Sequence, residues 1–251
     1  CLSLLEIAVK NMIRILHTAD WHLGQTFFGY DRTEEHEAFL DWLAGEILRQ
    51  EIDALIIAGD VFDVSNPSAA SQSIYYRFIY RVTAENPNLQ IVIVAGNHDS
   101  ATRLASLSRL LQGMGLHIIG SLKEKVEGIR LDDCIIYPIP YFHVEQVRTV
   151  YRRDVQSQAE AFSCICEEIL STADPAYRHI AMAHAFLANA EVCESDRFAQ
   201  VGGADLVPSH IFDGFSYVAM GHLHRRQHAG GRVWYSGSPL PYSFSEAAQR
   251  K

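Results

Sequence analysis

Residues 54–63 read ALIIAGDVFD, an unbroken apolar run that gives way at once to a glycine and acidic residues. An apolar run of this length is typical of a strand that is buried on both faces, as in a parallel sheet. Four more runs of the same kind occur along the chain, at residues 13–16, 91–94, 180–183 and 217–220. We therefore expect five buried strands, each of which ends in a polar loop.

Helical patterns separate these strands. Apolar residues recur with helical spacing in the segments 34–50, 71–83, 101–112 and 157–170. In the first segment, Phe39, Trp42, Leu43 and Ile47 form one apolar stripe. The alternation of strand and helix predicts an α/β fold with a mainly parallel sheet.

Two weaker patterns predict further strands. Residues 126–137, with a turn at Asp132-Asp133, indicate a strand pair that begins a second sheet. Residues 232–235 follow Gly230-Gly231 and indicate a closing hairpin strand.

The composition is that of an ordinary globular protein. Of the 251 residues, 48% are hydrophobic and 20% are charged, which allows a large buried core. No apolar run is long enough to span a bilayer, so no membrane contact is expected. The net charge of −9 is unusual for a protein that holds DNA by its surface charge. Either the substrate is not nucleic acid, or metal ions and a local patch attract it.

The cysteines and the N-terminus give two further expectations. The cysteines are Cys1, Cys134, Cys164, Cys166 and Cys193. Their odd number and their spacing favour reduced thiols in a cytoplasmic protein over disulfides or a zinc knuckle. Residues 1–11 lack the basic segment and cleavage site of a secretory signal. Because a strand follows directly after Met12, residues 1–11 are interpreted as an extension or an artefact, with a lipidated Cys1 as the alternative.

Polar clusters directly follow the expected strands. They are Asp20-Trp21-His22, Gly59-Asp60-Val61-Phe62-Asp63, Gly96-Asn97-His98-Asp99, His184 and Gly221-His222-Leu223-His224. Ligand sites of α/β sheets form beyond the carboxyl ends of the strands, so we expect these loops to meet at one edge of one sheet. A single cluster is explained as well by a solvated turn. Five clusters that each follow a buried strand favour one shared site.

The residue types indicate metal ions. Carboxylate, imidazole and amide oxygen without thiolate suit Mn²⁺, Fe or Zn²⁺. The candidate ligands are Asp20, His22, Asp60, Asn97, His184, His222 and His224, which are too many for one ion. Two ions about 3.5–4 Å apart that share a carboxylate fit this set and form the usual clamp for phosphoryl displacement. Gly59, Gly96 and Gly221 are expected where a strand turns sharply, so that backbone can approach a metal.

The order of these motifs, D-x-H, G-D-x-x-D, G-N-H-D, H and G-H-x-H, resembles that of the calcineurin-like metallophosphoesterases. The motifs extend from Asp20 to His224, which is most of the chain. The resemblance implies layered β-sheets flanked by helices, an α/β/β/α sandwich. Residues 15–24, 58–63 and 235–241 are similar, in addition, to the SbcD-type exonucleases, a bacterial branch of that family.

The resemblance also implies a role for each site residue. Asp20, His22 and His224 would hold one ion, Asn97, His184 and His222 the other, and Asp60 would bridge both. His98 would stabilise the developing charge and protonate the leaving oxygen. Asp63 would hold His98 in the useful tautomer.

The favoured hypothesis is a DNA nuclease for end processing and repair that uses two divalent ions, with Mn²⁺ preferred over Mg²⁺, Fe or Zn²⁺. The alternative is a phosphatase or phosphodiesterase that acts on small substrates with the same site. Val64-Ser65 follows the second motif, where the protein phosphatases of this family have Arg-Gly, and this favours the nuclease. A scaffold without chemistry is disfavoured because no ligand is missing.

The resemblance implies DNA as substrate and an SbcC-type ATPase as partner of the full-length protein. Such relatives are longer and carry a DNA-capping region and an ATPase-binding segment. Since the chain ends soon after its Gly-Ser-Pro motif, residues 12–251 are expected to form the nuclease domain without those parts. Members of this family often form homodimers through helices of this domain.

Residues beside the site loops carry weaker expectations. The candidates for weak phosphate contacts are Tyr30, Arg32, Arg103, Arg225 and Arg226. His17 and Asp99 are interpreted as structural residues, with Asp99 hydrogen-bonded to the backbone of its loop.

Overall fold

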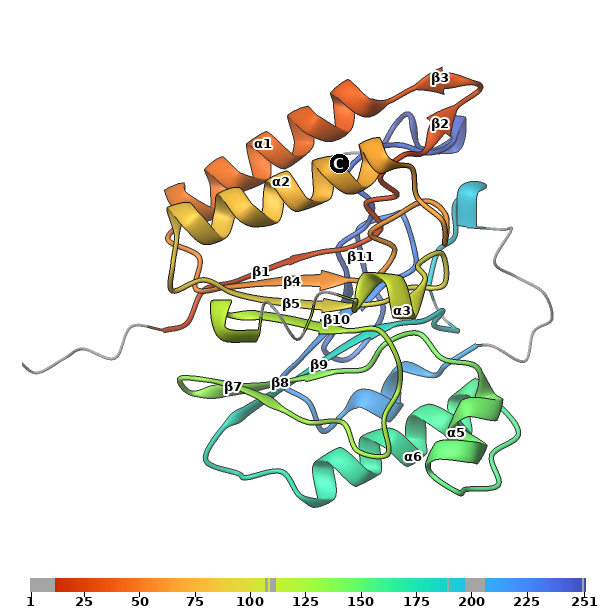
Figure 1. The fold of residues 1–251 in the computed structure, drawn as a ribbon. Coiled ribbons are helices and arrows are strands. Elements are labelled where there is room, and N and C mark those ends of the chain that lie inside the picture. Colours follow the sequence, from red (N-terminus) through yellow and green to blue (C-terminus); the bar gives the residue numbers. More distant parts are fainter. Residues whose placement is uncertain (1–11, 107, 109–111, 189, 197–205, 250) are drawn as a thin grey trace, which may run out of the picture.

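The computed structural model describes residues 12–106, 108, 112–188, 190–196, 206–249 and 251. Helices and sheets form four layers in the order helix, sheet, sheet, helix (Figure 1). This arrangement confirms the α/β/β/α sandwich that the resemblance implies. The expected N-terminal extension, residues 1–11, lies outside the described residues.

The first sheet consists of four parallel strands in the order β1-β4-β5-β6. Its strands are β1 (Ile15–Thr18), β4 (Ala54–Ala58), β5 (Gln90–Val94) and β6 (Leu116–Ile119). Two helices, α1 (Thr33–Arg49) and α2 (Ala69–Glu85), cover its outer face (Figure 1). Every residue of β4 is buried, as its apolar run predicts, because helices lie on one face and a second sheet on the other.

The second sheet has six strands in the order β11-β12-β10-β9-β8-β7. They are β7 (Ile129–Leu131), β8 (Cys134–Pro138), β9 (Arg178–His184), β10 (Tyr217–Gly221), β11 (Gln227–His228) and β12 (Val233–Tyr235). The antiparallel pair of β7 and β8 confirms the expected start of a second sheet. β12 forms the expected hairpin with β11 and also pairs in parallel with β10.

The remaining elements are short or lie outside the sheets. Helices α5 (Val144–Val150) and α6 (Gln158–Ser171) cover the outer face of the second sheet (Figure 1). The others are β2 (Thr26–Phe27), β3 (Tyr30–Asp31), α3 (Ala101–Leu104), η1 (Gln112–Met114), η4 (Ser209–Phe212) and η5 (Phe244–Glu246).

Three apolar clusters hold the four layers together. One packs α1 and α2 onto the first sheet, and another packs α6 onto the second. The third lies between the sheets and contains small and medium side chains such as Ala58, Val92, Met182 and Ala219. These side chains allow the two sheets to lie face to face, so the ends of their central strands come together.

Two helical predictions need correction. The sequence places Trp42 in the buried stripe of α1, but it is 59% exposed, whereas Leu40, Leu43 and Ile47 are buried. Adjacent helical residues point about 100° apart, so Trp42 points away from the sheet that its neighbour Leu43 contacts. The helix expected over residues 101–112 is observed as α3 at Ala101–Leu104, and residues 107 and 109–111 lie outside the described residues.

Three smaller features of the structure concern His17, the cysteines and the helices. His17 has a structural role, because its Nδ1 lies 3.1 Å from the hydroxyl of Tyr217 in the other sheet. Burial lowers the pKa of His17 to about 3. The four described cysteines, Cys134, Cys164, Cys166 and Cys193, are free thiols. Within the described ranges, no helix combines the length and the apolar character needed to cross a membrane.

Candidate metal centre

The seven expected ligands lie together, but they come from two sheets and not from one. Asp20, Asp60 and Asn97 follow β1, β4 and β5 of the first sheet, while His184 and His222 lie at the ends of β9 and β10 of the second. The expectation of a single sheet was wrong because the apolar runs do not reveal which strands pair. Since the sheets are stacked, the carboxyl ends of their central strands meet at one edge of the sandwich.

The first group of candidate ligands consists of Asp20, His22 and His224. Their ligand atoms all lie within 4.8 Å of one another, and all three residues are buried. The Nε2 atoms of His22 and His224 are 3.2 Å apart. Two imidazole lone pairs at this distance repel each other unless a proton or a cation lies between them. This geometry fits a cation that both nitrogens bind.

The second group consists of Asp60, His184 and His222, again with ligand atoms within 4.8 Å of one another. Asn97 belongs to it as well, because its Oδ1 lies 2.9 Å from His184 Nε2 and 3.0 Å from His222 Nδ1. Both nitrogens and the amide oxygen therefore point at one small volume.

Asp60 lies between the two groups. Its Oδ2 atom is 3.7 Å from His22 Nε2 in the first group and 3.3 Å from His184 Nε2 in the second. Its Oδ1 atom accepts a hydrogen bond from the backbone N–H of His98, at 2.9 Å. A carboxylate in this position is able to bind one ion in each group.

The backbone is strained at four of the candidate ligands. Asp20, His22, Asp60 and His222 have positive φ angles of 56°, 46°, 51° and 103°. Residues other than glycine rarely adopt this region, at a cost of about 1–3 kcal/mol each, and such strain clusters at functional sites. Backbone hydrogen bonds between the loops hold the strained turns, among them Asp20 N–H to Gly59 O and His22 N–H to Asp60 O, both at 3.0 Å.

The glycines of the motifs allow the loops to approach closely. A Cβ atom on Gly96 would lie 2.1 Å from Asp60 Oδ1, and one on Gly221 would lie 1.9 Å from the carbonyl oxygen of Ala58. Of the three glycines, Gly59 has the positive φ angle that a sharp turn requires, at 91°. Gly96 and Gly221 make room for the Asp60 side chain and for backbone, and the approach of backbone to a metal at these glycines stays a prediction.

The electrostatics of the site fit divalent cations. Burial raises the pKa of Asp20 to about 7, although His184 and His224 lower it. Burial also lowers the pKa of His222 to about 3, so this imidazole keeps a lone pair available. Among the described residues, no lysine or arginine pairs with Asp20 or Asp60. Against the effect of burial, Asp60 and Asp20 raise the pKa of His184 to about 9, so this imidazole carries the positive charge beside the buried carboxylates. Divalent metal ions, which the family implies, would supply that charge in its place.

The other ring nitrogens of the ligands are oriented by neighbours, as is usual for metal-binding histidines. His184 Nδ1 donates to the carbonyl oxygen of Ala58, at 2.8 Å. His22 Nδ1 lies 3.3 Å from Asp63 Oδ1. In both residues, Nε2 is then left to face its group of ligands.

The expected contact between the Asp63 carboxylate and His98 is corrected. His98 Nδ1 instead lies 2.8 Å from the backbone carbonyl oxygen of Asp63, while the carboxylate faces His22. The strained loop after β4 turns the Asp63 side chain towards the first ligand group. His98 is exposed, and its ring lies 4.8 Å from that of His22, centroid to centroid. Asp99 has the structural role expected, since its carboxylate accepts from the backbone N–H groups of Val61, Phe62 and Gly96.

The candidates for phosphate contacts divide into two kinds. Arg32 is buried, and it donates to the carbonyl oxygen of Pro241 at 2.6 Å and pairs with Glu35. It is therefore a structural residue, because its guanidinium is engaged within the protein. The other candidates are exposed: Tyr30, Arg103, Arg225 and Arg226. Contact between these four residues and DNA stays a prediction.

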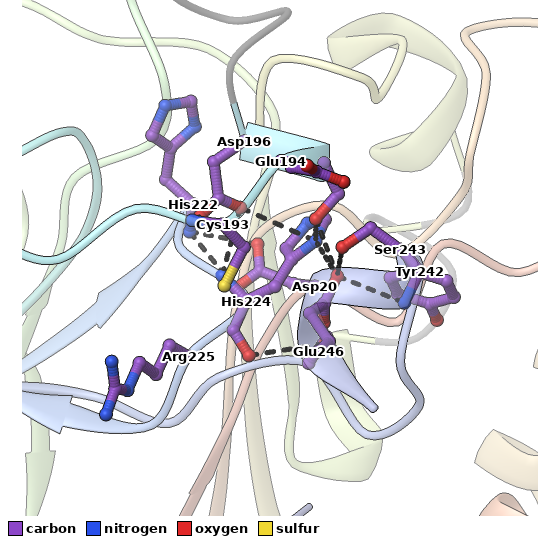
Figure 2. A network of polar contacts seen from close by, with 12 residues as sticks. Asp20, Cys193, Glu194, Asp196, His222, His224, Arg225, Tyr242, Ser243 and Glu246 are labelled. Carbon is purple, nitrogen blue, oxygen red and sulfur yellow. Dashed lines mark hydrogen bonds and ion pairs between the residues drawn. The ribbon is translucent and has the colours of Figure 1, made fainter. Parts of the chain in front are cut away.

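The structure also adds residues that the motifs did not indicate. Tyr242 packs against His22 and His224, with ring centroids at 5.2 and 5.3 Å. Behind His224 lies a buried polar network that contains Asp196 and Glu246 (Figure 2). These residues lie outside the strand-end motifs, with Glu246 at the end of η5. The one sequence hint is that Tyr242 and Glu246 closely follow the Gly-Ser-Pro motif.

Comparisons with known proteins identify relatives. Residues 13–226 match the family described as calcineurin-like phosphoesterase. A protein of Rhodobacter capsulatus that is named as the SbcD subunit of the nuclease SbcCD is 37% identical over an alignment of 259 positions, which covers 93% of this chain and 64% of the relative. Proteins of the same name are 31% identical in Escherichia coli K12, with coverage of 95% and 63%, and 35% identical in Bacillus subtilis, with coverage of 95% and 64%. The chain thus spans under two thirds of the length of these relatives.

Proposed function

The chain belongs to the calcineurin-like phosphoesterase family, and from this membership we propose that it is a DNA nuclease that hydrolyses phosphodiester bonds with two divalent metal ions. The observation that carries the proposal is the position of Asp60. Its carboxylate lies within 3.7 Å of a histidine nitrogen in each ligand group. A shared carboxylate between two groups of ligands is the arrangement needed to clamp a phosphate during in-line displacement.

Each ligand keeps the role that its group suggests. Asp20, His22 and His224 form one position, and Asn97, His184 and His222 form the other, with Asp60 shared. When bound, the two ions would neutralise phosphate charge and activate the attacking water. Mn²⁺ is the ion proposed, from among the ions Mn²⁺, Fe and Zn²⁺ that suit a mixture of imidazole nitrogen with carboxylate and amide oxygen.

His98 is proposed to deliver a proton to the leaving oxygen. Because a carbonyl oxygen only accepts, His98 Nδ1 carries the hydrogen that is donated to Asp63 O. Nε2 is then the nitrogen that exchanges protons with substrate. Its exposure and its place beside His22 suit contact with a phosphate held by the metal centre.

DNA is proposed as the substrate because the relatives at 31–37% identity carry the name of a nuclease subunit. The net charge of −9 means that DNA affinity must come from the ions and from exposed residues near the loops. We expect weak binding that falls steeply with salt, and slow nicking or end trimming that requires Mn²⁺ and is abolished by a chelator. The measurement compares hydrolysis of linear duplex DNA with that of a phosphomonoester under matched conditions.

The same preparation of the Asp60→Asn variant serves as control against a contaminating nuclease. Vigorous monoester hydrolysis with no cleavage of DNA would contradict the nuclease and favour a phosphatase for small substrates.

The partners are proposed from the relatives and from one exposed surface. The name of the relatives indicates a subunit of a complex, so an SbcC-type ATPase is proposed as partner of the full-length protein, in the cytoplasm. Domain boundaries of 12–251 are proposed for the nuclease domain. A homodimer through α1 and α2 is supported by the exposed Trp42, Tyr76 and Tyr80, at 59%, 38% and 73%.

The homodimer proposal predicts a change of mass. Large exposed aromatic residues on adjacent helices are unfavourable in a monomer and typical of interfaces. We expect the Trp42→Glu/Tyr80→Glu double variant to sediment as a monomer where the unaltered chain sediments as a dimer. The variant Glu85→Gln, at the end of α2, serves as control. A monomeric unaltered chain at concentrations of about 10 μM would contradict the proposal, since interfaces of this kind usually bind more tightly.

A further inference from the structure

Two buried carboxylates lie behind the metal ligand His224, on the side away from His22. Glu246 is 1% exposed and Asp196 is 5% exposed. In Figure 2 both carboxylates point towards His224, Glu246 from η5 and Asp196 from a segment far from it in the sequence. Neither belongs to the seven ligands, and a buried carboxylate is costly unless it has a function or strong partners. The contacts of each carboxylate show how it acts on His224.

A hydrogen-bond relay connects the imidazole of His224 to Glu246. His224 Nδ1 lies 2.9 Å from Ser195 Oγ, and Ser195 Oγ donates to Glu246 Oε1 at 2.6 Å. An ionised carboxylate only accepts, so the single hydroxyl hydrogen of Ser195 points to Glu246. Ser195 Oγ must then accept from His224, which places the hydrogen on Nδ1. The Nε2 lone pair is left free on the side that faces His22.

The hydrogen-bond donors around Glu246 keep its carboxylate ionised, as this relay requires. Its Oε1 atom accepts from the backbone N–H of Tyr242 at 3.1 Å and from Ser243 Oγ at 3.0 Å. Its Oε2 atom pairs with Lys251 Nζ at 2.5 Å. Each of these partners is a donor, and one is a cation, so the carboxylate is held ionised. Glu246 thus acts as a fixed negative charge at the end of the relay.

Asp196 has a different task. Its Oδ1 atom accepts from the backbone N–H of His224 at 3.2 Å, and its Oδ2 atom accepts from the backbone N–H of Cys193 at 2.7 Å. It therefore joins the loop of His224 to the loop that carries Ser195. Asp196 thus fixes the backbone of His224, and its Oδ1 atom, 3.5 Å from His224 Nδ1, adds negative charge beside the ring. The hydrogen bonds of the relay fix the orientation and tautomer of the ring.

We propose that Glu246, acting through Ser195, is a positioning residue that holds His224 in its metal-binding tautomer and raises the affinity of the first metal position. This rests on the two-ion assignment proposed above and does not depend on the substrate. At the second position, His184 Nδ1 donates to the neutral carbonyl of Ala58, and the described residues show no hydrogen-bond relay from this nitrogen to a carboxylate. Substitution of Glu246 should therefore weaken metal binding at the first position and leave the second unchanged.

The test is a calorimetric titration of the metal-free chain with Mn²⁺. Glu246→Gln keeps the shape of the side chain but removes the charge and introduces a donor towards Ser195. Loss of such an orienting partner typically weakens metal affinity about 10–100-fold. We expect the dissociation constant of one position to rise by this factor and that of the other position to stay unchanged. The matched control is Glu191→Gln, whose carboxylate is exposed and pairs with Arg225.

A second pair of variants tests the relay if Glu246→Gln fails to fold. Ser195→Ala removes the hydroxyl and should weaken the same position, whereas Ser195→Thr keeps it and should restore affinity. The ¹⁵N chemical shifts of His224 in the metal-free chain report its tautomer, which we expect to be Nδ1–H in the unaltered chain and mixed in Glu246→Gln and Ser195→Ala.

The outcomes separate the two proposals. If the unaltered chain binds one Mn²⁺ at saturation, the two-ion assignment fails. The unaltered chain is instead expected to bind two ions. If Glu246→Gln and Ser195→Ala then also bind two ions, with unchanged affinity and an unchanged tautomer of His224, the role of Glu246 is overturned. Equal weakening of both positions would also overturn it, since it would indicate a general structural effect.

Discussion

Asp60→Asn is expected to lower Mn²⁺ occupancy at both positions and to reduce phosphodiester hydrolysis by about 10³-fold, equivalent to about 4 kcal/mol of transition-state stabilisation. The reason is that one carboxylate oxygen of Asp60 lies near a histidine of each ligand group. Asparagine keeps the size of the side chain and an oxygen that accepts from His98 N–H, so the loop is retained while the shared charge is lost. Metal analysis after dialysis and single-turnover hydrolysis measure the two effects.

The matched control for this substitution is Asp41→Asn. It removes the same charge from an exposed residue of α1 that pairs with Arg81, and it should change neither measurement. Two tightly bound ions together with unchanged hydrolysis in Asp60→Asn would show that Asp60 does not bridge. Loss of one ion alone would assign Asp60 to a single position.

His98→Ala is expected to keep both ions and DNA binding while kcat falls about 10²–10⁴-fold, the usual contribution of a general acid. His98 is exposed and contacts the protein through Nδ1 and the carbonyl oxygen of Asp63, so its removal leaves the ligand groups intact. Turnover and metal content are measured on the same sample. For a substrate with a good leaving group, kcat of His98→Ala should fall less than it does for DNA, because a good leaving group departs without being protonated by a general acid.

The clearest contrary result would be an empty metal position in His98→Ala. His22, Asp63 and His98 themselves have ligand atoms within 4.8 Å of one another, so this outcome would make His98 a ligand. Asp63→Asn provides the comparison. Because the Asp63 carboxylate faces His22 and its backbone holds His98, the variant should weaken metal binding at the first position and leave the proton transfer of His98 in place.

Several features of the fold can be predicted from local sequence. The apolar runs at residues 54–58 and 91–94 form buried strands, because an apolar run of that length is buried on both faces of a parallel sheet. Polar candidate ligands follow both runs. The strand pair around Asp132-Asp133 is predicted from its turn. By contrast, the burial of α1 was predicted incorrectly at Trp42, since the side of a helix that meets a sheet is decided by packing against a partner.

The sequence by itself determined which residues carry the chemistry, because Asp20, Asp60 and His184 follow strands directly and strand ends are set by local composition. Only the tertiary structure decided that two stacked sheets share the site, that Arg32 is buried, and that Glu246 lies behind His224. The physical reason is that these contacts join segments far apart in the chain. Periodicity describes neighbours along the backbone, whereas sheet pairing, burial and hydrogen-bond partners depend on how distant segments pack.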